Sequence, residues 1–197
     1  IGIKGARGAG KTTLLLQYVH RSGYPIEKIL YISCDHPAMA GVSLYDLARD
    51  FFQEGGKLLL LDEIHKYRDW KNYLKGIYDQ FKSQYQFLVT GSGRLEFSRK
   101  AGDSLAGRFL KFHIFPFTLA ELLSSRKELK DFKNSPLGDF EIASTDKTKQ
   151  AFENLWELSG FPEPFLNGKK SFWRVWSEAY GQQIVRDDLR TMADIRN

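Results

Sequence analysis

Cysteine is almost absent from this chain, since Cys34 is the single cysteine among 197 residues. One cysteine excludes an internal disulfide framework and a cysteine-rich zinc site. The histidines His20, His36 and His113 are scattered without metal-ligand spacing, so no zinc site is expected. A lone thiol also suits a reducing compartment, and we therefore expect a cytoplasmic protein.

Long apolar runs and a strong charge of one sign are also missing. No run approaches the ~20 apolar residues of a membrane span. The sequence also shows no charged stretch followed by an apolar one before the first motif, so we expect no signal peptide in it. Hydrophobic residues make up 42% of the chain, which suffices for one large domain or for one domain with part of another. The net charge of +5 is compatible with DNA binding but is weak evidence for it.

What the sequence does contain is a glycine-rich motif close to its start. Residues 5–12 match the phosphate-loop pattern G-x-x-x-x-G-K-[ST]. Residues 1–4 before the motif indicate the end of a buried strand, and residues 13–19 after it indicate a helix. A chance glycine-rich turn is the alternative, but both flanks argue against it. The predicted nucleotide-binding residues are Gly5, Ala6, Arg7, Gly8, Ala9, Gly10, Lys11, Thr12 and Thr13.

Each part of this loop has an expected role in holding phosphate. Backbone N–H groups and the positive end of the helix dipole point at the anion, and Gly5, Gly8 and Gly10 let the main chain approach it. Lys11 is expected to reach the β- and γ-phosphates, and the Thr12 hydroxyl to ligate Mg²⁺. Because only four residues precede the loop and the final residues look helical, both ends are expected to be cut from a longer protein.

A second motif follows about fifty residues after the first. Leu58–Leu61 is a continuous apolar run, typical of a strand buried on both faces of a parallel sheet, and it ends in Asp62 and Glu63. Asp62 is expected in the Mg²⁺ shell. Glu63 is expected to polarise the water that attacks the γ-phosphate, which favours hydrolysis over binding alone. Two solvated acids at a strand end are the alternative.

Two weaker candidates lie further along the chain. Thr90 and Ser92 end a predicted strand, where a hydroxyl can help to position the attacking water; Ser92 is the first candidate, and an ordinary turn is the alternative. Arg108 precedes another predicted strand and could face a neighbouring subunit's γ-phosphate as an arginine finger. Arg94 and Arg99 compete for that role, and a solvated or structurally paired arginine is the alternative.

Strands that alternate with helices predict an α/β fold of the P-loop NTPase class, a parallel sheet flanked by helices with a small C-terminal helical region. The predicted strands are 1–4, 26–33, 57–61, 86–90 and 109–115, and the predicted helices are 13–19, 43–53, 67–83, 150–158 and 172–192. Thr118, followed by Glu121, predicts one further helix start. We expect an ATPase core at 1–126, a linker at 127–149, and a lid or the start of a truncated second domain at 150–197.

Two other nucleotide-dependent classes are disfavoured. His65 completes a literal D-E-x-H and suggests a helicase, but the chain has no room for a second recombinase-type domain, so helicase stays a minor alternative. His65 is interpreted as a surface or supporting residue. No Asn-Lys-x-Asp follows the fourth or fifth strand, so the guanine signal of GTPases is missing and adenine is favoured.

In order and spacing, these motifs resemble prokaryotic AAA+-type ATPases in which a P-loop domain is joined to a C-terminal domain of unknown function. The segments that carry this resemblance are residues 5–14, 61–66 with Trp70, 90–92, 105–108, 115–118 with 121–122, 160–164 and 186–187. The sequence departs from that family at Ser159, where a second glycine is common, and at Asp188, where isoleucine is usual.

The resemblance implies ATP binding and hydrolysis, with Lys11, Thr12, Asp62 and Glu63 in the roles given above. It also places Ser92 at the sensor-1 position. We therefore expect a Mg²⁺-dependent ATPase that binds ATP or ADP and works alone or as a homo-oligomer. A slow ATP/ADP-gated switch that controls a protein or DNA partner is the alternative, and DNA binding as the main activity is a third.

Overall fold

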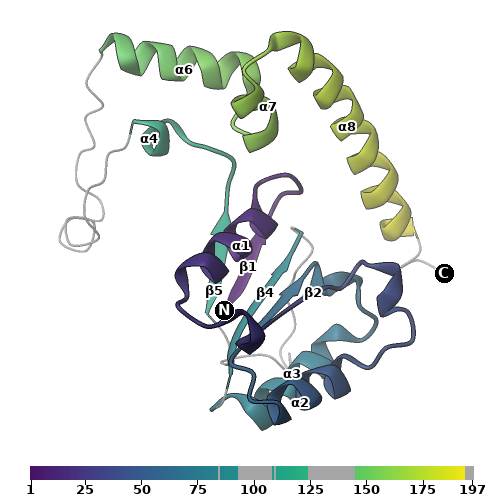
Figure 1. Cartoon of the computed structure of the whole chain (residues 1–197). Helices are drawn as coiled ribbons and strands as arrows, with labels where there is room; N and C mark the ends of the chain where they lie inside the picture. The colour runs from purple at the N-terminus through teal and green to yellow at the C-terminus, as the bar shows by residue number, and fades with distance from the viewer. Residues whose placement is uncertain (84, 93–107, 109, 124–144, 194–197) are drawn as a thin grey trace. The chain divides into compact units, whose positions relative to one another are not determined.

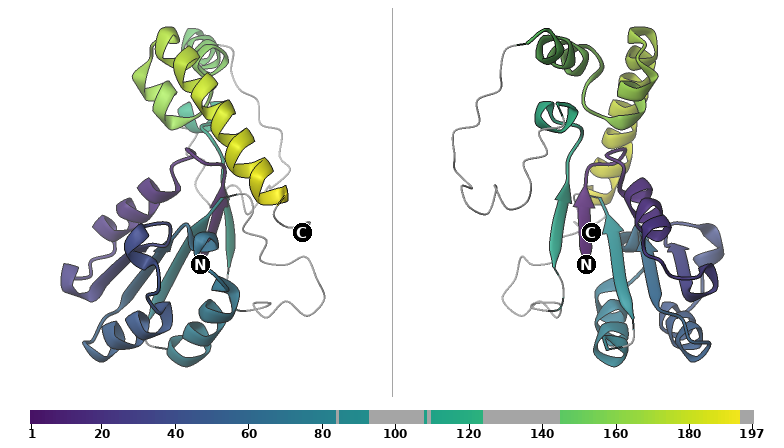
Figure 2. Two further views of the ribbon diagram at one scale, coloured as in Figure 1. Left: turned by 90° about the vertical axis from the view of Figure 1, so that its right-hand side faces the viewer. Right: turned by 60° about the vertical axis from the view of Figure 1, so that its left-hand side comes forward.

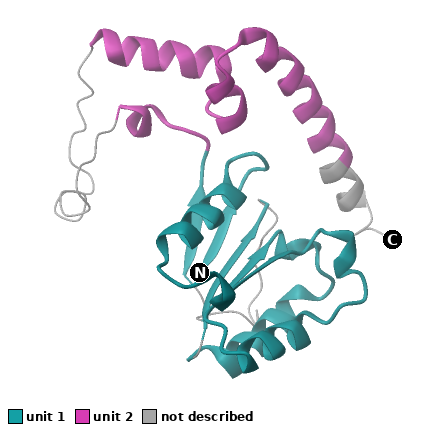
Figure 3. Cartoon of the chain, viewed as in Figure 1, with its two compact units in different colours: residues 1–115 teal, residues 116–197 magenta. Residues whose placement is uncertain are grey.

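The structure is a computed structural model that describes residues 1–83, 85–92, 108, 110–123 and 145–193. The chain divides into two compact units, residues 1–115 and 116–197 (Figure 3). The first unit holds a sheet with its helices, and the second is helical (Figure 1). Within the described residues, no helix is both long and apolar enough to cross a membrane.

The first unit is built on a five-stranded sheet in which every neighbouring pair of strands is parallel (Figures 1 and 2). The strands are β1 (Gly2–Gly5), β2 (Ile29–Ser33), β3 (Leu58–Asp62), β4 (Gln86–Gly91) and β5 (Lys111–Ile114). Their order across the sheet is β2-β3-β4-β1-β5. The strand β4 therefore lies between the two strands that carry the predicted motifs.

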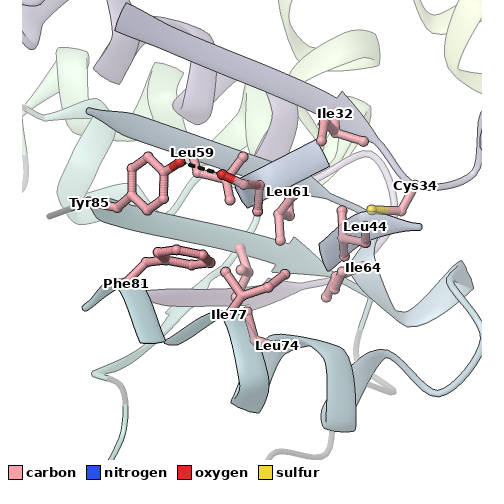
Figure 4. Packing of buried hydrophobic residues seen from close by; sticks show 12 residues of the cluster. Ile32, Cys34, Leu44, Leu59, Leu61, Ile64, Leu74, Ile77, Phe81 and Tyr85 are labelled. Atoms are coloured by element: carbon pink, nitrogen blue, oxygen red, sulfur yellow. Dashed lines mark hydrogen bonds between the residues drawn. The ribbon is translucent and has the colours of Figure 1, made fainter. Parts of the chain in front are cut away.

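Apolar side chains on both faces of the sheet form the core. The helices of this unit are α1 (Lys11–Arg21), α2 (Leu44–Gln53) and α3 (Trp70–Phe81). Leu58 and Leu60 of β3 pack in a cluster with Leu15 of α1. Leu59 and Leu61 point the other way, into a cluster with α2 and α3 (Figure 4). The run Leu58–Leu61 is thus buried on both faces, as predicted.

Most predicted elements of this unit form, with shifted ends. The Ser43 hydroxyl accepts the N–H of Asp46 and so caps α2 as expected. The second strand begins at Ile29 rather than Ile26, because residues 26–28 form a 3-10 turn, η1 (Ile26–Lys28). The 3-10 turn η3 (Ile64–Lys66) precedes the third helix, which begins at Trp70 rather than Tyr67, with Asp69 as its N-cap.

The second unit contains α4 (Leu119–Leu122), α6 (Asp146–Leu158), α7 (Pro162–Asn167) and α8 (Lys170–Ala193). Thr118 and Glu121 form the predicted capping box. The helix α6 begins four residues before the predicted start at 150, because Thr145 caps it, and α7 was not predicted. The Phe117 N–H donates to the carbonyl of Gly160 at 2.7 Å, which joins two of the segments that carry the family resemblance.

Candidate nucleotide site

The glycine-rich loop joins the end of β1 to the first residue of α1 and has the backbone of a phosphate cradle. Gly8 and Gly10 have φ values of 76° and 93°, a region that favours glycine. Gly10 is the N-cap of α1, and no side chain caps the helix there. An uncapped helix start leaves N–H groups and the positive end of the helix dipole available to an anion. The loop therefore fits a phosphate group.

Gly5 meets a different constraint from the one that its place in the motif suggests. A Cβ atom at Gly5 would lie 2.5 Å from both the carbonyl oxygen and the Cγ2 atom of Ile114 in β5. Since β1 and β5 pair directly at this point, glycine is needed here for the approach of the neighbouring strand.

Lys11 is buried, and its ammonium group lies among oxygen atoms at the carboxyl end of the sheet. Its Nζ donates to the carbonyls of Gly5, at 3.3 Å, and Ala6, at 3.1 Å. It also lies 3.4 Å from Oε1 of Glu63 in an ion pair. The structure therefore brings the lysine of the first motif to the glutamate of the second.

The Asp62 carboxylate is held by donors from four parts of the chain and is only 2% exposed. Its Oδ2 accepts the hydroxyls of Thr12, at 2.6 Å, and Tyr31, at 2.8 Å. Its Oδ1 accepts the Thr90 hydroxyl and the backbone N–H of Glu63. A threonine hydroxyl beside a carboxylate is the oxygen ligand set that Mg²⁺ prefers, so these residues fit the predicted metal.

Tyr31 is a site residue that sequence reasoning missed. Burial, followed by the hydrogen bond to Asp62 and its negative charge, raises the pKa of the Tyr31 phenol to about 12. The phenol therefore stays protonated and donates at neutral pH. No sequence signal marks it, because its reach to Asp62 depends on β2 pairing with β3 so that Ser33 lies beside Asp62.

Thr90, the second candidate for positioning water, supports both acids of the second motif. Its side chain is fully buried. The hydroxyl donates to Asp62 and accepts the backbone N–H of Glu63 at 3.2 Å. This position follows from the place of β4 beside β3.

Glu63 and Ser92 are connected through His65. Glu63 has a left-handed backbone, with φ 49° and ψ 40°, and caps the turn η3. Its Oε2 lies 3.3 Å from Nδ1 of His65. The other ring nitrogen of His65, Nε2, lies 3.2 Å from the Ser92 hydroxyl. Ser92, the first candidate at the end of β4, thus contacts His65.

Arg108 is not brought to these residues. Its guanidinium forms a two-point ion pair with Asp79 of α3, at 2.8 and 3.2 Å, and holds the pKa of that carboxyl below its ordinary value. Because β5 begins at Lys111 and runs parallel to β1, Arg108 lies toward the amino ends of the strands, opposite the glycine-rich loop. Its predicted action on a neighbouring subunit stays a prediction, and Arg94 and Arg99 lie outside the described residues.

A family model described as an AAA domain matches residues 1–123, which is more than half of the chain. The chain belongs to this family. The AAA domain is a P-loop ATPase domain of the AAA+ type, so the resemblance drawn from the motifs and the predicted α/β fold class are both confirmed.

Relatives of this chain occur in archaea and bacteria. It is 36% identical over 196 residues to the uncharacterized protein MJ1637 of Methanocaldococcus jannaschii, covering 94% of this chain and 35% of the relative. It is 26% identical over 204 residues to an uncharacterized protein of Haemophilus influenzae, covering 99% of this chain and 47% of the relative. The chain therefore spans about a third to a half of the length of these relatives.

Among solved structures, the chain is similar to the AMPPCP-bound DnaA from Aquifex aeolicus. The TM-score is 0.49 at 16% identity, covering 94% of this chain and 57% of that one. PCH-2 of C. elegans gives the same score and identity, with 93% of this chain and 60% of that one covered.

Proposed function

We propose that the first unit binds Mg·ATP in the glycine-rich loop and hydrolyses it. The observation that carries the proposal is the meeting of the two motifs at the carboxyl end of the sheet, where Thr12 donates to Asp62 at 2.6 Å and Lys11 pairs with Glu63. Family membership supports nucleotide binding by an ATPase in general. Hydrolysis, dependence on Mg²⁺ and the identity of the base as adenine belong to the proposal.

The residues of the first motif would hold the triphosphate. Uncapped N–H groups at the start of α1 would donate to the phosphate oxygens, and Lys11 would exchange its present carbonyl partners for the β- and γ-phosphates. Thr12 and Asp62 would hold the Mg²⁺ ion, which would supply positive charge against the phosphate oxygens as the bond breaks. Tyr31 and Thr90 fix the orientation of the Asp62 carboxylate that would hold the metal.

Glu63 would activate the attacking water. Its side chain is 24% exposed and its carboxylate lies beside Lys11, so the residue is open to solvent and close to the end of the phosphate cradle. When Lys11 turns to phosphate, Oε1 of Glu63 becomes available to accept a proton from water. The backbone N–H of Glu63 is held by Asp62 and Thr90, which keeps the residue next to the metal site.

A slow nucleotide-gated switch is the second candidate, and the contacts of Glu63 favour it. Both carboxylate oxygens lie within 3.4 Å of a nitrogen, Oε1 of Lys11 and Oε2 of His65. The glutamate must lose one of these contacts before it can accept from water, and this exchange would slow turnover. A switch of this kind would control a protein or DNA partner, and cytoplasmic location also stays a prediction.

Phosphate release from Mg·ATP, measured over a hundredfold range of protein concentration, tests the proposal. The wild-type chain should release phosphate, and Glu63→Gln should bind ATP and release it at least about a hundredfold more slowly. Equal rates for the two proteins would overturn the proposal. Activity that rises with concentration and is lost in Arg108→Ala would support a homo-oligomer in which Arg108 acts in trans, while low and flat activity would favour the switch.

A further inference from the structure

A continuous line of polar contacts runs from the end of β4 to the phosphate cradle. The Ser92 hydroxyl lies 3.2 Å from Nε2 of His65, and Nδ1 of His65 lies 3.3 Å from Oε2 of Glu63. The line ends at Lys11, 3.4 Å from the other Glu63 oxygen. His65 is the middle member, and its side chain is only 13% exposed.

The chemistry of the two neighbours limits how the imidazole can contact them. A carboxylate can only accept hydrogen bonds, so a bond between Nδ1 and Oε2 of Glu63 requires hydrogen on Nδ1. In this structure the contact has the distance of an ion pair but not the geometry of a hydrogen bond. At Nε2 the Ser92 hydroxyl donates or accepts according to which ring nitrogen carries hydrogen. The ring therefore contacts both partners, and Ser92 reaches Glu63 through His65.

The backbone holds His65 in this place. Glu63 has the left-handed conformation that starts the turn η3, and the N–H of Lys66 closes the turn on the carbonyl of Glu63 at 2.9 Å. Ile64 between them is fully buried in the core under α2 and α3. The glutamate and the histidine thus stand on either side of an anchored residue, so their side chains are held on the same turn.

We propose that His65 is a positioning residue that holds Glu63 for its reaction with water. Through its contact with the Ser92 hydroxyl, it also makes the position of Glu63 depend on Ser92. The inference rests on the proposed function, because it assigns Glu63 to the activation of water. When Lys11 turns to phosphate, the Glu63 carboxylate loses its contact at Oε1, and the contact of Oε2 with His65 keeps it aligned. A side chain that only fills space at this turn would have no effect on that alignment.

The test compares ATP hydrolysis by the full chain as wild type, His65→Ala, His65→Asn, Ser92→Ala and Glu63→Gln. Asparagine places an N–H donor where Nδ1 stands but has no atom at Nε2. We expect His65→Ala to lower kcat about a hundredfold, as a loss of alignment does, with KM for ATP within about threefold of wild type. His65→Asn should recover at least about tenfold of that loss.

The serine provides the second arm. Ser92→Ala should lower kcat about tenfold in the wild-type background and by less than about twofold in His65→Asn, because the contact it removes is already broken there. This arm also keeps the proposal testable if His65→Ala fails to fold. Effects of Ser92 and His65 that multiply, or a His65→Ala loss that asparagine does not recover, would overturn the proposal.

The variant Glu63→Gln distinguishes a failure of the positioning role of His65 from a failure of the proposed function. If Glu63→Gln is inactive while His65→Ala keeps the wild-type kcat, the positioning role fails and the proposed function stands. If Glu63→Gln hydrolyses ATP as fast as wild type, the proposed function fails, and the role of His65 falls with it. If Glu63→Gln is inactive and the His65 and Ser92 variants behave as expected, both stand.

Discussion

Replacing Thr90 with valine removes one hydroxyl beneath the site and keeps the shape of the side chain. The change takes a donor from the buried Asp62 carboxylate and an acceptor from the N–H of Glu63. A hydrogen bond to a charged group contributes about 1.5–3 kcal/mol. The Glu63 N–H retains Asp62 as a partner. Losing its bond to the Thr90 hydroxyl therefore adds only about a few tenths of a kcal/mol to the free-energy cost. We therefore expect Thr90→Val to destabilise the first unit by about 2–3 kcal/mol.

Cys34 provides a reporter of the unfolding of this unit. It is the single cysteine of the chain, it lies in the core cluster under α2 and α3, and its N–H donates to the carbonyl of Asp62 at 2.9 Å. Burial first, and then the charges of Asp62 and its neighbours, raises the pKa of the thiol to about 12. The native thiol is therefore inert, and brief alkylation pulses across a urea series measure the unfolded fraction.

The expected shift is large enough to measure. At a urea dependence of about 2 kcal/mol per molar, 2–3 kcal/mol lowers the midpoint by about 1 M. Thr90→Ser keeps the hydroxyl and loses one buried methyl, so it should cost only about 1 kcal/mol. A midpoint for Thr90→Val equal to that of wild type, or a serine variant as unstable as the valine variant, would refute the account of how Asp62 is held.

Three further predictions follow from other contacts. Gly5→Ala should destabilise the first unit by about 1–3 kcal/mol, since its Cβ meets Ile114 at 2.5 Å. Gly76→Ala, in open space on α3, should stabilise the unit by about 0.5–1 kcal/mol. Urea midpoints measured by alkylation of Cys34 test both. The pKa of Tyr31 is raised from 10.0 to about 12, so its contribution to stability is present below pH 10 and lost between pH 10 and about 12. Tyr31→Phe should remove this part of the loss and leave the parts due to Cys34 and Tyr85, whose pKa values are also raised; a pH profile of the urea midpoint equal to that of wild type would contradict it. Lys11→Ala should weaken binding of a fluorescent ATP analogue at least about tenfold with Tm nearly unchanged, and equal affinity would rule out the phosphate role.

The sequence was enough to predict the elements whose signals are local. The fixed positions of residues 5–12 predict the turn between a strand and a helix, and the unbroken apolar run Leu58–Leu61 predicts a strand buried on both faces. Ser43 and Thr118 predict helix starts because each hydroxyl accepts the backbone N–H of the residue three positions later in the chain, which caps the helix. The short helix α7 (Pro162–Asn167) was missed because six residues with two prolines show no helical period.

The contacts that complete the site could not be predicted in the same way. The bonds of Tyr31 and Thr90 to Asp62 depend on which strands lie next to β3 and in what register. The contact of His65 with Ser92 depends on the turn that begins at Glu63. Glu63 has a left-handed backbone, which its residue type does not predict. The partner of Arg108, Asp79 of α3, is likewise set by the tertiary fold.

The most direct test of the central claim is a single turnover of Mg·ATP with the full chain in excess, stopped at intervals and analysed for ADP. Because every ATP molecule is bound, the rate reports the chemical step alone. The account predicts that wild type converts bound ATP to ADP, while Glu63→Gln keeps ATP bound and converts it at least about a hundredfold more slowly. Conversion by Glu63→Gln at the wild-type rate would contradict the claim that Glu63 activates the attacking water.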